Sequence, residues 1–297
     1  MRKKVYSATI TPLTADGGLD VEGLNKIFGR NIRHGIDGIF IFGTMGEWQC
    51  FDADFRDRMV AESVLAVAGR AELLVGITDV STEAALDNMR RVARLAFDSY
   101  VFMLPKKEPD PMPALRAVLD AADRPVYYYH CPANNGVGLS LAQFASIMSH
   151  PRLKGIKNSA GDMRLRRELI LMKRDLALAP MLLEGHEWAV DEALLAGYDG
   201  MLCGMGALGS KFMAGIARAV DEGNFTEAGR LQNRFIRLFH GVYGENLETV
   251  WVGQKYALKC LGLCASELTL IQKMDALTET RKREIEACVE SFRDELD

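Results

Sequence analysis

The sequence lacks the features that would place it in several special classes of protein. No apolar run approaches the roughly 18 residues that a membrane-spanning helix needs, so no membrane partner is expected. The basic start, MRKKVYSATITPLT, is not followed by the long apolar region of a signal peptide, and we therefore expect a cytoplasmic location. The formal net charge of -4 shows no basic excess, which argues against a general nucleic-acid-binding role.

Cysteine and histidine are too few and too scattered to form a disulfide framework or a metal site. The six cysteines come without a secretory signal, so we expect reduced and mostly buried thiols. Cys260 and Cys264 lie four residues apart but have no second matching pair. None of the five histidines has a metal-ligand spacing with another, and no metal site is expected.

Short β-rich stretches alternate with amphipathic segments along most of the 297 residues, and the apolar content of 48% is ordinary for a globular protein. The expected strands are Tyr6–Thr11, Gly38–Phe42, Leu73–Ile77, Ser99–Met103, Val126–His130, Leu153–Lys157, Met181–Glu184 and Gly200–Cys203. The expected helices between them are Val21–His34, Asp54–Ala68, Thr82–Ala96, Pro111–Ala122, Leu141–Met148, Met163–Asp175, Trp188–Ala196 and Ala207–Val220. Ser81 and Ser140 are the expected N-caps of two of these helices.

Eight strands that alternate with eight helices predict parallel crossover connections in an α/β protein. Their number fits a closed (β/α)8 TIM barrel of about 250 residues, and an open doubly wound sheet is the alternative. After Gly223 the pattern is helical only, over Phe225–Tyr243, Thr249–Leu261 and Thr278–Leu296. We therefore expect a barrel over residues 1–223 and a C-terminal helical extension over residues 224–297.

A lysine stands at the carboxyl end of the sixth expected strand, in the stretch LKGIKNSAGD. An apolar environment disfavours the ammonium form of Lys157, lowers its pKa and makes the amine a nucleophile toward a carbonyl group. The alternative is a lysine whose stem packs while its head reaches water. Because barrel active sites lie at the carboxyl ends of the strands, the predicted fold favours the chemical role.

Two more groups fall at strand ends on the same predicted face. Tyr129 lies near the end of strand five, and the turn Gly43-Thr44-Met45-Gly46-Glu47 follows strand two. Glycines at positions 43 and 46 would let backbone amides approach an anion closely. The hydroxyls of Thr44 and Tyr129 can pass protons. The alternatives are a tyrosine that only packs and a turn that only connects a strand to a helix.

Residues 204–209, GMGALG, match the spacing G-x-G-x-x-G after a predicted strand. A dinucleotide site would also need a further strand with an acidic residue near its end, but only helices follow here. We expect close backbone packing at the barrel mouth, and a phosphate-binding loop is the alternative.

Four segments, in order and over essentially the whole chain, resemble the dihydrodipicolinate synthase / N-acetylneuraminate lyase family of pyruvate-dependent class I aldolases. ATITPLTADGGLD resembles the family's first strand and loop, and FGTMGEWQCF resembles its GTTGE turn. YYHCPANNGVGLS resembles its YNVP segment, and GIKNSAGD resembles the GIKEATGD segment around the Schiff-base lysine. The C-terminal helices also resemble those of the family.

The resemblance implies catalytic roles for Lys157 as the amine that condenses with pyruvate or another 2-oxo acid, for Tyr129 as the proton shuttle, and for Thr44 as its partner. It implies no metal and no organic cofactor, and a homotetramer built as a dimer of dimers. The residues expected to bind substrate are Gly43, Met45, Gly46, Glu47, Lys107, Asn134, Gly185, Glu187 and Cys203.

The chain departs from the synthase pattern at positions that meet substrate. Met45 replaces a second threonine, Lys106-Lys107 replace two tyrosines of which one serves a neighbouring subunit, and Asn134 replaces an arginine. Gly185 and Glu187 align with the segment where the sialate lyase binds sugar hydroxyls. These departures argue against a true dihydrodipicolinate synthase.

The sequence therefore predicts a Schiff-base lyase or aldolase that cleaves or forms a C–C bond of a 2-oxo acid, such as a 2-keto-3-deoxy sugar acid, and that releases or consumes pyruvate. Within the family, dihydrodipicolinate synthase, N-acetylneuraminate lyase and a 2-oxo acid dehydratase remain alternatives. Outside it, the alternatives are a non-catalytic 2-oxo acid sensor and a phosphate-handling barrel isomerase.

Overall fold

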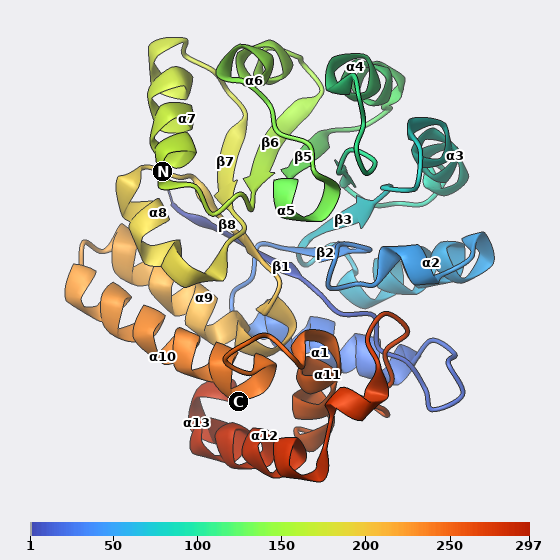
Figure 1. Ribbon diagram of the computed structural model, residues 1–297, viewed down its shortest axis with the longest axis vertical. Helices are drawn as coiled ribbons and strands as arrows, with labels where there is room; N and C mark the ends of the chain where they lie inside the picture. Colours follow the sequence, from blue (N-terminus) through green and yellow to red (C-terminus); the bar gives the residue numbers. More distant parts are fainter. Residues whose placement is uncertain (1) are drawn as a thin grey trace.

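The computed structural model describes residues 2–297, and its centre is a closed barrel of eight parallel strands (Figure 1). Each strand pairs with the next along the chain, and β1 closes the ring against β8. The strands are β1 Lys4–Ala8, β2 Gly38–Ile41, β3 Glu72–Gly76, β4 Ser99–Phe102, β5 Val126–His130, β6 Leu153–Asn158, β7 Met181–Glu184 and β8 Gly200–Cys203. The expected (β/α)8 barrel is confirmed, and the open sheet is wrong.

Helices connect the strands and surround the barrel (Figure 1). The main connecting helices are α1 Val21–Arg33, α2 Ala53–Val67, α3 Thr82–Val92, α4 Pro111–Ala121, α6 Leu141–Met148, α7 Met163–Asp175, α8 Val190–Ala196 and α9 Gly206–Asp221. Short helical turns follow three strands, namely η1 Trp48–Cys50, α5 Pro132–Asn135 and η2 Glu187–Ala189. Ser81 caps α3, and Ser140 forms a capping box with Gln143 at the start of α6, as the sequence predicts.

The C-terminal extension consists of α10 Phe225–Tyr243, α11 Val250–Cys260, η3 Met274–Ala276, α12 Glu279–Ser291 and α13 Arg293–Leu296. Helix α10 packs along α9, and α11 and α12 pack against α10 (Figure 1). The extension thus rests on the last helix of the barrel. The predicted domain division between residues 223 and 224 falls in the turn between α9 and α10 and stays a prediction.

The hydrophobic side chains form two layers, as alternation along parallel strands requires. One layer fills the barrel and includes Tyr6, Phe40, Tyr127 and Tyr129. The other lies between the outer faces of the strands and the helices. A functional side chain at the end of a strand can therefore point either into the barrel centre or outward under a helix, and its position along the strand decides which.

Several expected elements end at other residues in the structure, for example α3, which ends at Val92 and not at Ala96. Strand β1 stops at Ala8 instead of Thr11, because the chain then turns over the barrel rim, where the Thr11 hydroxyl donates to the Gly46 carbonyl at 2.7 Å. The last expected helix is interrupted at Phe292, whose buried ring packs against Phe212 with 5.9 Å between ring centroids.

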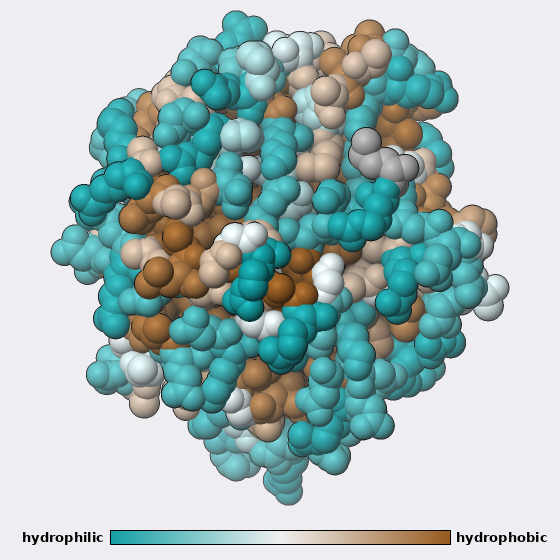
Figure 2. Space-filling view, turned by 180° about the vertical axis from the view of Figure 1, so that it is seen from behind, coloured by the Kyte–Doolittle hydropathy of each residue, from teal (hydrophilic) through white to brown (hydrophobic). Residues whose placement is uncertain are grey.

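Figure 2 shows the molecule from behind, and most of this face is hydrophilic, with hydrophobic side chains gathered in a few places. Among residues 2–297, no helix combines the length and the apolar character needed to cross a bilayer.

Candidate active site

Lys157 and Tyr129 lie side by side at the carboxyl end of the barrel, because β5 and β6 pair with these two residues in register. Lys157 is buried, and its Nζ atom lies 4.2 Å from the centroid of the Tyr129 ring. The Nζ atom also lies over the ring of Phe40, at 5.6 Å from its centroid. Both site residues point into the barrel, so the structure brings the predicted amine and phenol together.

The electrostatics of Lys157 favour the neutral amine. Burial lowers the pKa of the Lys157 ammonium from its ordinary value of 10.5, and the negative charge of Glu187 opposes this shift. The aromatic faces of Tyr129 and Phe40 attract a cation, but they give no hydrogen bond that would replace lost water. The result is an amine that releases its proton more easily than a solvent-exposed lysine does.

A short hydrogen-bond chain leads from Tyr129 toward the barrel mouth. The Tyr129 phenol lies 3.4 Å from the Thr44 hydroxyl, and the Asn134 amide donates to the same Thr44 Oγ1 at 2.9 Å. Asn134 fills one of the two acceptor positions of the Thr44 oxygen, so either the Thr44 hydroxyl or the Tyr129 phenol can donate in the contact between them. Burial raises the pKa of Tyr129, which keeps the phenol protonated.

The turn after β2 contains backbone amides that donate to no other backbone group within residues 2–297. A Cβ atom at Gly43 would lie 2.6 Å from the ring of Phe40, and one at Gly46 would lie 2.9 Å from the backbone nitrogen of Phe42, so both positions require glycine. Within residues 2–297, the amides of Met45 and Gly46 donate no hydrogen bond to another backbone group. Two amides that lack a protein acceptor can hold a carboxylate.

The loops after β7 and β8 form another part of the site wall. A Cβ atom at Gly185 would lie 2.7 Å from Cε of Lys157, so glycine leaves room for the lysine stem. The Glu187 carboxylate accepts hydrogen bonds from the amides of Gly204 and Met205, the latter at 3.2 Å. Glu187 is therefore committed to the β8 loop and acts on the lysine through its charge.

Met45 and Cys203 add apolar surface near the amine. Met45 is buried, and a Cβ atom at Gly204 would lie only 2.8 Å from its Cγ, so this glycine makes room for the methionine. Cys203 is fully buried, and burial raises the pKa of its thiol well above 9.0. Both residues thus serve as neutral walls and not as charged groups.

Two predicted substrate-binding residues are placed elsewhere by the structure. The carboxylate of Glu47 is fully buried, pairs with Lys255 and accepts from the Thr269 hydroxyl at 2.7 Å, so it anchors the C-terminal extension and does not face substrate. Lys107 is exposed, and its amide donates to the Asn135 carbonyl at 2.7 Å, while its neighbour Lys106 lines the nearby cavity. The Glu47 carboxylate therefore faces away from Lys157 and Tyr129, the Lys107 side chain lies apart from them, and the substrate roles of both residues stay predictions.

One contributor to the site was not predicted. The indole nitrogen of Trp251, in the C-terminal extension, donates to the Thr44 carbonyl at 3.0 Å across 207 positions of sequence. No local pattern in the sequence signals such a long-range contact. The extension therefore helps to hold the turn that carries Thr44.

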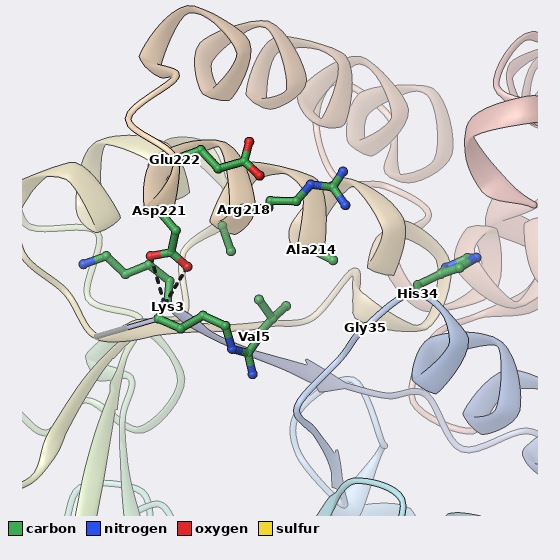
Figure 3. A pocket seen from close by; sticks show the side chains of 10 residues that line it. Lys3, Val5, His34, Gly35, Ala214, Arg218, Asp221 and Glu222 are labelled. Carbon is green, nitrogen blue, oxygen red and sulfur yellow. Dashed lines mark hydrogen bonds between the residues drawn. The ribbon is translucent and has the colours of Figure 1, made fainter.

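Two cavities lie at opposite ends of the barrel. One, of about 340 Å³, opens beside Thr44 and Asn134 at the carboxyl ends of the strands. The other, of about 520 Å³, lies where β1 begins, and residues such as His34, Arg218 and Asp221 line it (Figure 3). None of the predicted site residues lines the second cavity. Among residues 2–297, no cluster of His, Cys, Asp and Glu side chains is arranged to hold a metal ion.

Comparison with known proteins gives a consistent result. The model of the family described as "Dihydrodipicolinate synthetase family" matches residues 1–292. A 4-hydroxy-tetrahydrodipicolinate synthase from Pelobacter propionicus is 28% identical over 274 residues, which cover 91% of this chain and 92% of that protein. An N-acetylneuraminate lyase from Enterobacter sp. is 29% identical over 238 residues and covers 77% of each chain.

Solved structures show the same fold. A prophage protein of the dihydrodipicolinic acid synthase family from E. coli, determined in complex with pyruvate, has a TM-score of 0.86 at 21% identity and covers 98% of both chains. A Clostridium difficile protein in complex with mannosamine has a TM-score of 0.88 at 19% identity, over 98% of this chain and 99% of that one.

Proposed function

The chain belongs to the dihydrodipicolinate synthetase family of pyruvate-dependent, Schiff-base-forming aldolases, and on this premise we propose that Lys157 is its nucleophile and Tyr129 its acid/base. The observation that carries the assignment is the position of Lys157, buried at a strand end with its amine over the Tyr129 ring. The reaction makes or breaks a C–C bond next to the keto group of a 2-oxo acid.

The carboxylate of the 2-oxo acid binds to the amides of Met45 and Gly46. These amides donate to no other backbone group within residues 2–297, and the Gly43 and Gly46 positions allow close approach. Met45 supplies an apolar wall where a hydroxyl would bind the same carboxylate. The bound acid then presents its keto carbon to Lys157.

The neutral Lys157 amine attacks the keto carbon, and loss of water together with uptake of one proton gives a protonated imine. This cation is an electron sink, so a C3 proton can leave and an enamine can form. In the synthetic direction the enamine C3 attacks an aldehyde carbon, and the aldehyde oxygen takes up a proton. In the cleavage direction the same steps run in reverse, and water finally releases pyruvate and the free lysine.

Tyr129 and Thr44 move the protons in these steps. The phenol lies against the lysine and within 3.4 Å of the Thr44 hydroxyl, whose second contact is the Asn134 amide. Loss of such a group slows a reaction by about 10²–10⁴-fold. We therefore expect Tyr129→Phe to lower kcat by that factor, while the protein still forms an imine slowly.

Borohydride reduction tests the nucleophile directly. With pyruvate present, reduction of the imine should fix one N-(1-carboxyethyl) adduct, and peptide mass mapping should place it on Lys157. Lys154→Arg is the matched control, because Lys154 lies on the same strand, pairs with Glu72 at 2.8 Å and should leave the adduct unchanged. An adduct on another lysine, or none at all, would sink the assignment.

Assays of binding, inhibition and turnover separate the rival functions. A 2-oxo acid sensor would bind pyruvate without turnover of any aldehyde, and a phosphate-handling isomerase would form no imine and would be inhibited by inorganic phosphate. Within the family, pyruvate consumption with aspartate semialdehyde or pyruvate release from sialic acid would identify the two activities named for the relatives. A 2-oxo acid dehydratase would release water from a 2-keto-3-deoxy sugar acid without C–C cleavage.

We further propose a homotetramer, built as a dimer of dimers, with pyruvate as the small-molecule partner and a cytoplasmic location. The proposal is supported by the family membership of the chain. Sedimentation equilibrium should give four times the 32.9 kDa of one chain. A monomer at micromolar concentration would contradict the assembly without affecting the assignment of Lys157.

A further inference from the structure

The turn between β2 and η1, residues 42–47, has a left-handed backbone at both of its ends. Phe42 has a φ angle of 57° and Glu47 one of 55°, although neither residue is glycine. A side chain in this conformation costs energy, so the conformation persists only where the surrounding structure enforces it. Backbone strain of this kind gathers at functional sites. The turn therefore needs contacts from elsewhere in the chain to keep its shape.

Two backbone carbonyls of this turn are held from outside it. The Thr11 hydroxyl, in the loop after β1, donates to the Gly46 carbonyl at 2.7 Å. The Trp251 indole, on α11, donates to the Thr44 carbonyl at 3.0 Å. The partners lie 35 and 207 positions apart in the sequence, and Thr11 is fully buried. The N-terminal and C-terminal parts of the chain thus fasten the same turn.

Helix α11 also fastens the end of the turn. Lys255 lies four residues after Trp251, so the two side chains extend from the same face of the helix. Lys255 pairs with the buried Glu47 carboxylate, which in addition accepts from the Leu270 amide at 2.6 Å. One face of α11 therefore grips the turn at two points, through an indole and through an amine.

These contacts determine where the amides of the turn point. The Thr44 carbonyl accepts from the Glu47 amide at 3.2 Å and closes a β-turn whose central residues are Met45 and Gly46. In a planar trans peptide the N–H points opposite to the C=O. Because Trp251 binds the Thr44 carbonyl on one side, the Met45 amide, which belongs to the same peptide unit, is directed to the other side. Neither central amide donates to another backbone group within residues 2–297, so both can serve an anion.

We propose that Thr11 and Trp251 are positioning residues for the carboxylate of the 2-oxo acid. They hold the turn from outside in the shape in which the Met45 and Gly46 amides face the acid, so the C-terminal extension takes part in substrate recognition. The inference rests on the proposed function, because it concerns the acid that Lys157 attacks. Donors that are fixed before binding do not have to be ordered when the carboxylate arrives. Loss of either outer contact should therefore weaken binding of the carboxylate and spare the keto group.

A pair of keto compounds tests the proposal with the full chain. Pyruvamide has the keto group of pyruvate but a neutral amide in place of the carboxylate. The measured quantity is the concentration of each compound that gives half-maximal borohydride trapping on Lys157. No second substrate is added, so a contact between such a substrate and Trp251, which lines the cavity beside Thr44, cannot affect the result. In the wild type we expect pyruvamide to require a concentration about tenfold or more above that of pyruvate, because a charged acceptor binds amides more strongly than a neutral one does. Equal concentrations would overturn the proposal.

Variants separate positioning from a general loss of structure. Thr11→Val and Trp251→Phe should each raise the pyruvate concentration by about threefold or more, the value of one hydrogen bond, and leave that of pyruvamide nearly unchanged. Thr11→Ser keeps the hydroxyl and should keep the wild-type ratio. Trp188→Phe is the control for the indole, because Trp188 packs on Phe239 and His240. A ratio that both Thr11→Val and Trp251→Phe leave unchanged, including an equal weakening of both compounds, would contradict the proposal. A wild type that forms no imine with pyruvate would instead defeat the proposed function.

Discussion

Two lysines are buried in this molecule, and their surroundings differ. Lys255, on α11 of the C-terminal extension, is fully buried, pairs with Glu47 and donates to the Leu268 carbonyl at 2.7 Å. Its partner Glu47 also accepts from the Thr269 hydroxyl. Each member of this charged pair therefore also has a hydrogen-bonding partner in the extension, and the pair joins the turn after β2 to the extension.

Lys157 is buried without such a counter-charge. Its amine lies over the rings of Tyr129 and Phe40, and the Glu187 carboxylate that influences it is bonded to amides of the β8 loop. Burial lowers the pKa of both Lys157 and Lys255, but only Lys255 has a carboxylate in contact. A buried lysine that has a partner holds structure together, whereas one without a partner is available for chemistry.

The largest expected difference between the two lysines is in activity. Lys157→Met should abolish the pyruvate adduct and lower turnover by more than about 10⁴-fold, because no other group can supply the amine. The same variant should be at least as stable as the wild type, because it removes a buried group that prefers water in its charged form. Borohydride trapping and thermal denaturation measure the two effects. A large fall in Tm would show that Lys157 has a structural role after all.

The next largest effect should be the stability loss of Lys255→Met. Removing this lysine leaves the Glu47 carboxylate buried without its counter-charge, and we expect a cost of about 3–5 kcal/mol in the free energy of unfolding. The double variant Glu47→Gln/Lys255→Met should recover part of that loss, because it removes the uncompensated charge. Urea denaturation provides the measurement. A loss below about 1 kcal/mol for the single variant would erase the distinction between the two lysines.

A smaller effect should appear in the pH dependence of stability. Because the pKa of Lys157 is lower in the folded state than the ordinary 10.5, the folded state binds fewer protons and stability rises with pH between the two values. The slope for one proton is at most about 1.4 kcal/mol per pH unit. The free energy of unfolding is measured against pH for the wild type and for Lys157→Met. The difference between the two curves isolates the titration of Lys157 from that of the cysteines and tyrosines. A difference that does not change in this pH window would mean that Lys157 titrates normally.

The smallest effect should come from the hydrogen bond between Trp251 and Thr44, which also joins the extension to the turn after β2. Trp251→Phe keeps an aromatic ring but loses the hydrogen bond to the Thr44 carbonyl, which is worth about 0.5–1.5 kcal/mol. We expect a Tm lowered by a few degrees and a modest fall in kcat, because the turn that holds Thr44 loosens. Trp188→Phe serves as the control, because Trp188 packs on Phe239 and His240 and not on the turn that carries Thr44. If both variants behave alike, the indole contact does not position the turn.

Most of the framework was predictable because it depends on local patterns. The strands at Val126–His130, Met181–Glu184 and Gly200–Cys203 agree with the structure residue for residue, since their apolar runs end in clear breaks. That Tyr129 and Lys157 lie on adjacent strands also follows from the strand order of a barrel, but their register, which shifts between Val126 and Tyr127, was not predicted. Helix α5 at Pro132–Asn135 was missed, because a helix of four residues leaves little pattern in the sequence.

The role of Glu47 shows where the sequence is insufficient. Its position in the GTMGE turn suggests a contact with substrate, yet its carboxylate is directed to a lysine and a loop more than 200 residues away. A charged side chain in a turn can face either the pocket or the protein interior, and local sequence is the same in both cases. Lys107, one residue from the cavity-lining Lys106, illustrates the same ambiguity.

The sequence by itself determined the barrel, the strand end that carries Lys157 and the neighbouring strand that carries Tyr129, because alternation and spacing act over a few residues at a time. Only the tertiary structure decided which buried lysine has a carboxylate partner, and which side chains line the cavity beside Thr44. Those outcomes depend on segments far apart in the chain, such as β2 and α11, whose meeting is set by the packing of the whole molecule.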